Sequence, residues 1–344
     1  MSRSTRIRGR RVIVPPPPGT DPQGVVLAFT VAPEHAGRRL DAYVQSRIPR
    51  LSRTRARAIV EASAHHPDGR RRRPGERVRA GETVILVRPR FAEPPVPFDV
   101  RVVYEDEALL VLDKPSGLPI HPTATYHRHT LTALLRERWG EPPPRVAHRI
   151  DRETSGLVVC ARTADAERCL KQAFADRKVH KTYLAIVRGC PTESQGVIDA
   201  PIASARSGLH VMMEVRDDGP ASTARTRWLR LACTPVCALL ALWPETGRQH
   251  QLRVHLAHIG HPIVGDKLYG PDGPALFVEH VETGMTPALA ARAGHDRQAL
   301  HAWRLELVHP TRGKPVEFRA DPPEDLGRLW ESMGGGSLLD HLPP

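Results

Sequence analysis

The sequence predicts an α+β protein, on three observations. Short apolar segments typical of strands recur along the chain, separated by loops rather than by regular helices, which argues against a doubly wound parallel sheet. Only a few stretches have the three-to-four-residue apolar spacing of a helix. The 344 residues suffice for two or three domains, and 40% of them are hydrophobic, enough to bury a substantial core.

The positive charge of the chain is concentrated at its N-terminal end. The net charge is +12, yet residues 1–90 alone hold 20 arginines and seven acidic residues, a balance of +13. The other residues hold 30 basic and 31 acidic side chains and are close to neutral. A basic module joined to a neutral body suggests a protein that holds a polyanion for another part of the chain to act on.

Proline, glycine and charge mark the expected boundaries. The acid-free start contains four consecutive prolines, and we expect residues 1–24 to form a disordered basic tail. A small α+β module then covers residues 25–88, and the four prolines of residues 89–99 indicate a semi-rigid linker. The body covers residues 100–330, and the Gly- and Pro-containing residues 331–344 are expected to be flexible.

The small module predicts two helices followed by two short strands. Residues 39–48, "RLDAYVQSRI", have helical apolar spacing, and residues 52–63, "SRTRARAIVEAS", form a second helix with Ser52 as its N-cap. Residues 76–89, "ERVRAGETVILVRP", read as two strands joined at Gly81. This order of elements resembles the S4 RNA-binding domain, although the loop of residues 62–76 is longer and richer in arginine than the family's usual turn.

That resemblance implies that a set of arginines in the module contacts RNA. The second helix and the long loop would supply them: Arg53, Arg55, Arg57, Arg70, Arg71, Arg72 and Arg73. Binding through phosphates would be strongly salt-dependent, because each neutralised phosphate releases counterions. A solvated, arginine-rich surface without a partner is the alternative interpretation.

The body contains one clear helix and several strands. Residues 163–177, "TADAERCLKQAFADR", have helical spacing with Thr163 at the cap. Strands are expected in "DEALLVLDKPSGL", "TSGLVVCAR", "KTYLAIVRG", "CALLALWP" and "HAWRLELVHP".

Five stretches of the body occur in an order that closely resembles the RluA-type pseudouridine synthases. They are residues 102–122, "HRIDRETSGLVV" at 148–159, "VHKTYLAIVRG" at 179–189, "TGRQHQLRVHLAHIGHPIVGDKLYG" at 246–270, and residues 300–310. The resemblance implies a mixed, largely antiparallel sheet and an enzyme that isomerises uridine in RNA, usually large-subunit ribosomal RNA. We further expect a cytoplasmic monomer that needs no obligate protein partner.

The chemistry of that reaction fits the residues. Pseudouridine formation breaks a C–N glycosidic bond and remakes it as a C–C bond to the same ring, so no atom enters or leaves and we expect no cofactor or metal. The reaction needs an ionised carboxylate beside the sugar, a means of extracting the base from its stack, and a pocket for the detached ring.

Asp151 matches the family's catalytic aspartate, which would either attack C1′ or take the C2′ proton. Because only Ile150 separates them, an extended segment would point Arg149 and Asp151 to the same face. The family counterpart of Arg149 enters the RNA stack where the target nucleotide leaves. A plain ion pair with Asp151 is the alternative for Arg149.

Two further residues complete the site that the resemblance implies. Tyr183 matches the tyrosine that stacks on the target base, although a strand tyrosine is otherwise an ordinary core residue. Arg253, in "HQLR", matches the arginine that pairs with the catalytic aspartate, and a bidentate contact would keep Asp151 ionised and oriented.

Two other classes of protein have to be weighed. A non-catalytic RNA-binding or ribosome-assembly protein could keep the same fold, but it would have no chemical need for Asp151, Tyr183 and Arg253 together. A metal hydrolase could use His250, His255, His258 and His261. The first three would lie at about 0°, 140° and 80° around a helix, too widely spread for one ligand face.

The cysteines and apolar segments indicate the compartment. The five cysteines form no CxxC pair, and Cys233 and Cys237 lie among apolar residues, so we expect buried free thiols, a reducing compartment and no structural zinc. No apolar run approaches the ~18 residues that cross a bilayer, and the N-terminus lacks the apolar stretch of a secretory signal.

Overall fold

The computed structural model describes residues 14–22, 24–48, 51–88, 93–123, 125–206, 208–209, 211–218 and 221–343. The chain divides into two compact units, Met1–Ala92 and Glu93–Pro344. Of the expected tail, residues 1–13 and 23 lie outside the described residues, as do residues 89–92 of the expected linker. Residues 14–22 differ from the expectation of disorder, because Pro17 is buried and its carbonyl accepts a hydrogen bond from the Thr20 hydroxyl at 2.6 Å.

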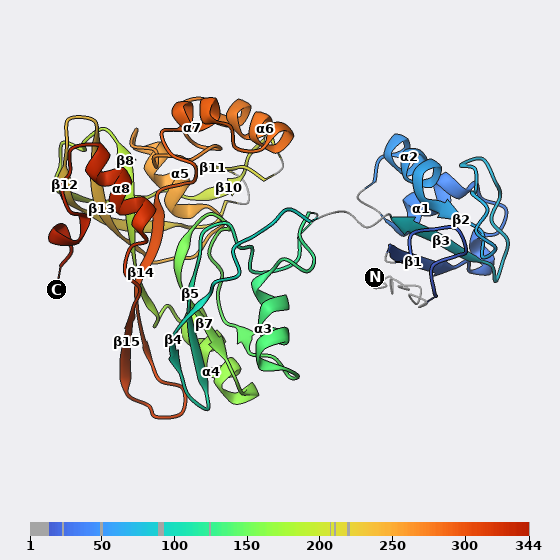
Figure 1. Ribbon diagram of the computed structural model, residues 1–344, viewed down its shortest axis with the longest axis horizontal. Helices are drawn as coiled ribbons and strands as arrows, with labels where there is room; N and C mark the ends of the chain where they lie inside the picture. Colours follow the sequence, from blue (N-terminus) through green and yellow to red (C-terminus); the bar gives the residue numbers. More distant parts are fainter. Residues whose placement is uncertain are drawn as a thin grey trace. The chain divides into compact units, whose positions relative to one another are not determined.

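The small unit packs two helices on a three-stranded antiparallel sheet. The strands β1 (Val25–Thr30), β3 (Thr83–Arg88) and β2 (Ala64–His65) lie side by side in that order. The helices are α1 (Leu40–Arg47) and α2 (Arg53–Ser63), preceded by the 3-10 turn η1 (Pro33–His35) (Figure 1). As predicted, Ser52 caps α2 by accepting a hydrogen bond from the Arg55 amide.

The strand expected before Gly81 does not form. Arg77 makes only an isolated bridge with Arg39, and the Val78 amide donates to the Arg38 carbonyl at 2.9 Å. The backbone of this segment is therefore used by the stretch that leads into α1 rather than by a hairpin with β3.

The large unit is built on a ten-stranded mixed sheet, which confirms the predicted fold class. The main order is β4-β5-β7-β14-β8-β13-β12-β9, and β6 and β15 pair with β7 and β14. Only β7 and β14 run parallel; every other pair in this sheet is antiparallel. The strands are β4 (Arg101–Glu105), β5 (Leu109–Lys114), β6 (Arg145–Val146), β7 (Ser155–Ala161), β8 (His180–Arg188), β9 (Gln195–Asp199), β12 (Arg225–Cys233), β13 (Cys237–Pro244), β14 (Leu300–Val308) and β15 (Pro315–Arg319). A separate pair joins β10 (Ile202–Ser204) to β11 (Met213–Val215).

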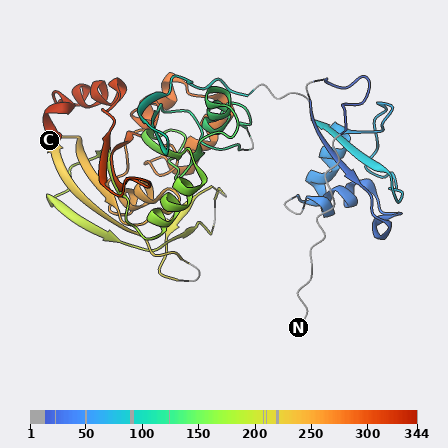
Figure 2. The ribbon, with the colours of Figure 1, turned by 90° about the horizontal axis from the view of Figure 1, so that it is seen from below.

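Helices bury both faces of the centre of this sheet (Figures 1 and 2). Successive residues of β5 alternate between two cores, since Leu110 and Leu112 belong to one cluster and Leu109 and Val111 to the other. The first cluster is closed by residues of α3 (Leu131–Trp139), α5 (Gln251–His258) and α8 (Glu324–Ser332), and the second by α4 (Ala164–Ala175). The remaining helices are α6 (Gly273–Thr283) and α7 (Pro287–Ala293).

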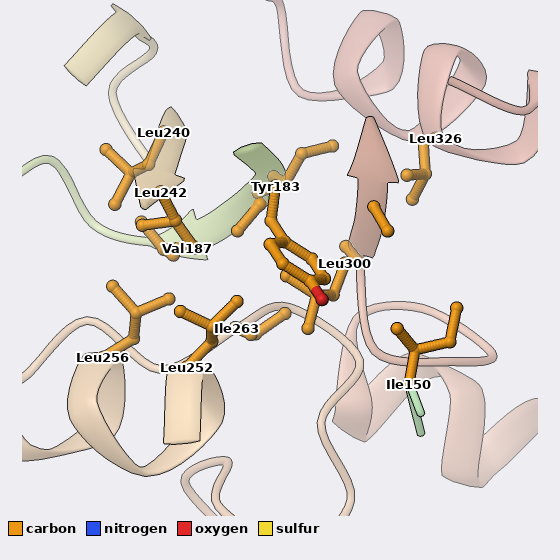
Figure 3. Packing of buried hydrophobic residues seen from close by; sticks show 14 of the residues in the cluster. Ile150, Tyr183, Val187, Leu240, Leu242, Leu252, Leu256, Ile263, Leu300 and Leu326 are labelled. Carbon is orange, nitrogen blue, oxygen red and sulfur yellow. The ribbon is translucent and has the colours of Figure 1, made fainter. Parts of the chain in front are cut away.

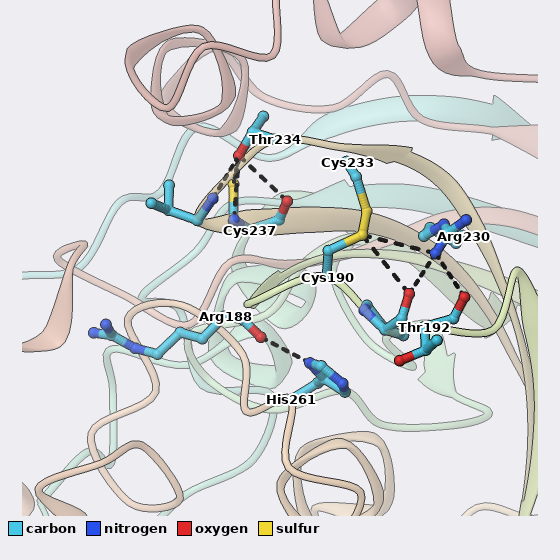
Figure 4. The surroundings of a disulfide bond; sticks show 10 residues. Arg188, Cys190, Thr192, Arg230, Cys233, Thr234, Cys237 and His261 are labelled. Carbon is cyan, nitrogen blue, oxygen red and sulfur yellow. Dashed lines mark hydrogen bonds between the residues drawn. A yellow bond between two sulfur atoms is a disulfide. The ribbon is translucent and has the colours of Figure 1, made fainter.

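One cysteine prediction is wrong. Cys233, expected as a free thiol, forms a disulfide with Cys190, and their Cα atoms are 5.9 Å apart (Figure 4). Cys190 follows β8 and Cys233 ends β12, and both strands flank β13, so the sheet brings together residues 43 positions apart in the sequence. Cys237 is a buried free thiol, as predicted. The disulfide removes the argument for a reducing compartment that rested on free cysteines.

The C-terminal segment also differs from the expected flexible end. Residues 338–341 form the 3-10 turn η2 (Leu338–His341), in which Leu338 is buried in the main core. His341 Nε2 donates to the Gly335 carbonyl at 2.9 Å, and the His341 ring meets the buried Trp330 edge-on. The apolar side chain of Leu338 therefore anchors a segment whose composition suggested a loose end.

Candidate active site

A cavity of about 1020 Å³ in the large unit brings the predicted catalytic residues together. Asp151, Tyr183, Arg253 and Arg149 all line it. They come from the loop before β7, from β8 and from α5, three segments that are far apart in the sequence.

A buried lysine holds the loop that carries Asp151 in place through hydrogen bonds to backbone carbonyls. Lys114, at the end of β5, is fully buried and donates to the carbonyls of Pro115, Leu118 and Arg152 at 2.8, 3.0 and 3.0 Å. The Ser116 hydroxyl donates to the carbonyl of Glu153 at 2.8 Å. Burial lowers the pKa of Lys114 to about 7, and the positive charge of Arg297 adds to this effect. Sequence reasoning gave no role to Lys114.

Close contact between two strands fixes the other end of the loop. Gly156, in β7, has φ +108°, and a Cβ there would lie 2.3 Å from the carbonyl oxygen of Ala302 in β14. Beside it, the Ser155 hydroxyl lies 2.9 Å from Nδ1 of His301, and Nε2 of His301 lies 2.7 Å from the Ala320 carbonyl. Since a carbonyl can only accept, His301 donates from Nε2 and accepts from Ser155 at Nδ1.

Arg253 joins two carboxylates. Its Nη1 donates to Oδ2 of Asp151 at 3.0 Å, so the predicted contact is present. The bidentate partner is however Asp266, which accepts from Nε at 2.7 Å and from Nη2 at 2.9 Å. Asp266 is fully buried and also accepts from the amides of Leu268 and Tyr269. The two-pronged contact expected for Asp151 is therefore made by Asp266, and Asp151 receives a single bond.

Asp266 lies in the quoted motif but was not singled out. The signal that could have found it is an acidic residue directly after an apolar run, in "PIVGDKLYG", where burial of the charge demands a cation.

Asp151 stays ionised despite its partial burial. Burial alone would raise the pKa of its carboxyl, but the positive charge of Arg253 outweighs this effect and holds the pKa below its ordinary value. The side chain is 24% exposed and faces the cavity. A charged oxygen is thus presented to the cavity at neutral pH.

His250 and Tyr269 lie beside this ion pair and were not predicted as site residues. Nε2 of His250 is 4.0 Å from Oδ2 of Asp151, and Nδ1 is 2.8 Å from the Tyr269 hydroxyl. Burial lowers the pKa of His250 to about 4, and the charge of Arg253 reinforces this. Because the Tyr269 oxygen accepts from the Met213 amide at 2.9 Å, its own proton is available to Nδ1, and His250 then presents an Nε2–H to the cavity.

Tyr183 belongs to the main core cluster and also lines the cavity. The side chain is 8% exposed and packs with Ile150, Leu252 and Leu300 (Figure 3). Its hydroxyl makes no hydrogen bond to any residue that the structure describes, and burial together with the charge of Asp151 raises its pKa. A hydroxyl that borders the cavity and has no partner among the described residues is available to a ligand.

Arg149 lies exposed at the same cavity and makes no ion pair with Asp151. The segment 148–151 is not a strand, yet Arg149 and Asp151 both line the cavity while Ile150 turns into the core. The alternative of a plain ion pair is therefore wrong.

In the small unit the predicted arginines divide into free and engaged side chains. Arg53, Arg55 and Arg73 are exposed and make no ion pair with any described residue. Three are engaged but exposed: Arg57 with Glu61, Arg70 with Asp68, and Arg71 with the Glu61 carbonyl. Arg72 is buried and bonds Glu76 and Glu82 at 3.0 and 3.3 Å, so it holds the loop together and the prediction that it contacts RNA is wrong.

Three of the four histidines of the metal-hydrolase alternative have separate partners, the first being His250 with Tyr269. His255 bonds Thr226 and the Ala200 carbonyl, while His261 bonds the Arg188 carbonyl. Helix α5 ends at His258, before His261. Within the described part of the chain, no group of three or more potential ligands is placed to hold a metal ion. No helix among the described residues is both long and apolar enough to cross a membrane.

An ionised aspartate, a tyrosine and a carboxylate-bound arginine meet at one cavity beside a mixed sheet, which is the site expected of an RNA-modifying isomerase of the pseudouridine synthase class, and known proteins agree. Residues 108–258 match the family model for RNA pseudouridylate synthase. The chain is 38% identical over 326 residues to ribosomal large subunit pseudouridine synthase D of Xanthomonas campestris pv. campestris, covering 91% of this chain and 95% of the relative. It is 37% identical over 323 residues to the protein of that name from Yersinia pestis, covering 90% and 95%.

A solved structure gives the same answer. Human RNA pseudouridylate synthase domain containing 4 is 29% identical, with a TM-score of 0.54, and the match covers 68% of this chain and 92% of the human chain. The chain belongs to the RluA-type RNA pseudouridine synthases, which are intramolecular isomerases.

Proposed function

We propose that this protein converts specific uridines of large-subunit ribosomal RNA to pseudouridine. The proposal is carried by the contact between Arg253 and Asp151 at the wall of a cavity that also holds Tyr183. It is supported by the relatives of 37% and 38% identity, whose names specify the ribosomal large subunit. We place its action in the cytoplasm, on RNA, as a monomer without a cofactor.

In this proposal Asp151 is the catalytic group and acts on the ribose. Its carboxylate is ionised at neutral pH, as both attack on C1′ and removal of the C2′ proton require. Tyr183 would offer the face of its ring to the target base, since it lines the cavity at which Asp151 lies.

Arg149 would fill the gap that the extruded nucleotide leaves in the RNA. Its guanidinium is exposed at the cavity and unpaired among the described residues, so it is available to stack on bases and to bind phosphate. Arg253 is a positioning residue. Its Nε and Nη2 atoms are bound to Asp266, and only Nη1 donates a hydrogen bond to Asp151.

The small unit would act as an S4-like RNA-binding module. Its two helices and three-stranded sheet carry the exposed residues Arg53, Arg55 and Arg73. These side chains have no carboxylate partner among the described residues, so phosphate contacts would cost no internal ion pair.

The experiment that tests the proposal is a map of pseudouridines in ribosomal RNA. Cells with and without the gene are compared by chemical modification and primer extension, and purified protein is added to RNA from the deleted strain. We expect particular large-subunit positions to lose their signal and to regain it with wild-type protein but not with Asp151→Asn. Identical maps from the two strains would refute the assignment of this RNA as the substrate.

A further inference from the structure

Lys181 is one of the charged residues of the cavity that have no role in the mechanism above. Lys181 lies in β8, two residues before Tyr183, and lines the same cavity. Side chains two apart in a strand point to the same face, about 7 Å from one another along the strand. Lys181 is therefore a neighbour of the residue that faces the target base.

The ammonium group of Lys181 lacks an acceptor among the described residues. It makes no hydrogen bond and no ion pair there, and its one specific contact is with the ring of Phe174, whose centroid is 6.0 Å away. The two glutamates that line the cavity are engaged elsewhere, since Glu245 pairs with Arg227 at 3.2 Å and Glu306 with Arg304 at 3.3 Å.

The ammonium group of Lys181 borders the cavity and is open to an anionic ligand. Burial lowers the pKa of Lys181, which means that the protein surroundings do not compensate its charge. Asp151 does not compensate it either, because that carboxylate is already bonded to Arg253. The positive charge of Lys181 is thus available to an anion inside the cavity.

We propose that Lys181 binds a phosphodiester adjoining the target uridine, so that one strand holds the nucleotide by its backbone and its base. This inference rests on the proposed function, because the anion is part of the RNA substrate. A phosphate is the anion that must enter the cavity with the nucleotide, and Lys181 lines that cavity beside Tyr183. The contact would be made only after the nucleotide has left the stack.

The test measures RNA affinity and rate separately in the full-length chain. Lys181→Met keeps the apolar stem against Phe174 and removes the charge, and Lys181→Arg keeps the charge. The matched control is Lys178→Met, since Lys178 lies three residues earlier, is 71% exposed and pairs with Asp176 at 3.4 Å. The substrate is a transcript that carries a uridine mapped as above.

In single-turnover reactions, we expect Lys181→Met to raise the RNA concentration that gives half the maximal rate about ten-fold. This is the effect of losing one charge-assisted hydrogen bond. The slope of log affinity against log salt should fall by about 0.7–0.9, one phosphate contact. The rate at saturating RNA should stay within about two-fold of wild type, as for loss of a binding contact alone. Lys181→Arg should restore most of the affinity, and Lys178→Met should behave as wild type.

A chemical change in the RNA tests the same contact independently of any change in the protein. A neutral methylphosphonate replaces the linkage on the 5′ or the 3′ side of the target uridine. At one of these positions it should weaken wild-type binding by the same factor as Lys181→Met, and the two changes together should cost no more than either alone.

The outcomes separate this inference from the proposed function. An active wild type with an unchanged affinity and salt slope in Lys181→Met overturns the role of Lys181 and leaves the function intact. The role of Lys181 is equally overturned if the effects of Lys181→Met and of both methylphosphonates are fully additive. A wild-type protein that modifies no large-subunit transcript overturns both.

Discussion

Asp151 combines two properties that seldom occur together, a largely enclosed carboxylate and a lowered pKa. Arg253 makes this possible at the cost of a second buried carboxylate, Asp266, whose charge balances the arginine. A charge that is kept in place before the substrate arrives needs no reorganisation during the reaction.

The first prediction removes the charge of Asp151. Asp151→Asn keeps the volume and can still accept the bond from Arg253, so folding and RNA affinity should remain close to wild type. The rate should fall by at least about a thousandfold, or about 4 kcal/mol of transition-state stabilisation. Single-turnover assays with Asp199→Asn as the control measure this, because Asp199 is exposed and outside the cavity. Turnover near the wild-type rate would exclude Asp151 as the catalytic group.

The second prediction separates two roles for Arg253. In Arg253→Leu the carboxyl of Asp151 loses the cation that lowers its pKa, so its pKa should rise. Because the ionised form is the active one, the saturating rate should fall at neutral pH and partly recover as pH increases. Arg253→Lys keeps a charge but cannot bond both carboxylates in the same geometry, and we expect an intermediate profile.

Single-turnover rates across pH at saturating RNA decide between these roles. If Arg253 served only to bind phosphate, both variants would reach the wild-type plateau and show weaker affinity alone. That result would contradict the account of how Asp151 stays charged.

At the scale of elements, the site depends on a close approach between β7 and β14, the one parallel pair of the large sheet. Gly156 permits this approach, since it has a positive φ and its α-carbon faces the backbone of Ala302. The "SG" of the motif "HRIDRETSG" is thus explained by packing rather than by chemistry.

The third prediction follows from that contact. Gly156→Ala places a methyl group 2.3 Å from the Ala302 carbonyl oxygen, so the strands must separate and the loop of Asp151 should shift. We expect a loss of at least about 2 kcal/mol in the free energy of unfolding. The control is Gly140→Ala, where φ is +74° and ψ is −157° and a Cβ would meet no atom within 4 Å; it should lose only about 1–3 kcal/mol, the cost of the backbone conformation, whereas Gly156→Ala should lose more because the clash is added. Urea unfolding compares the two variants. Equal losses in the free energy of unfolding would show that the close contact between β7 and β14 does not add to the cost of the substitution.

Local signals predicted elements well and long-range partners poorly. The caps Ser52 and Thr163 were identified because a capping side chain bonds an amide three residues away. Two long-range contacts were not predicted: the disulfide between Cys190 and Cys233 and the bidentate ion pair between Arg253 and Asp266. Both depend on which strands and loops become neighbours in the fold. Likewise a run of four arginines gives no sign that only Arg72 turns inward.

For the whole molecule, the separation of charge and chemistry into two units leads to a fourth prediction. Removal of residues 1–92 should leave a folded large unit, because its two main core clusters contain only residues beyond Ala92. RNA affinity should fall and its dependence on salt should become flatter, as the +13 balance of residues 1–90 is lost. Titrations at several salt concentrations test this, and equal slopes for the two proteins would show that the small unit is not the anchor.

The fifth prediction concerns stability against pH. Burial lowers the pKa of His148 to about 3 and that of His301 to about 4, below the ordinary value of about 6.5 for an unfolded histidine. As pH falls below about 6.5 the unfolded chain binds these protons first, so the stability present at neutral pH should be lost progressively toward pH 4. Urea unfolding between pH 7.5 and 4.5 should show this decline. A flat curve would mean that the two imidazoles titrate alike in both states.

The strands β5 and β7 are covered on both faces, so their amides can report on the opening of the unit. Their amides are paired across the sheet and lie between two apolar cores, so solvent deuterium can reach them only when the whole large unit opens. Their exchange rates would therefore read the global opening free energy directly, while loop amides near Asp151 would read local opening. Comparing the two sets before and after RNA is added would separate tightening of the active-site loop from stabilisation of the entire unit.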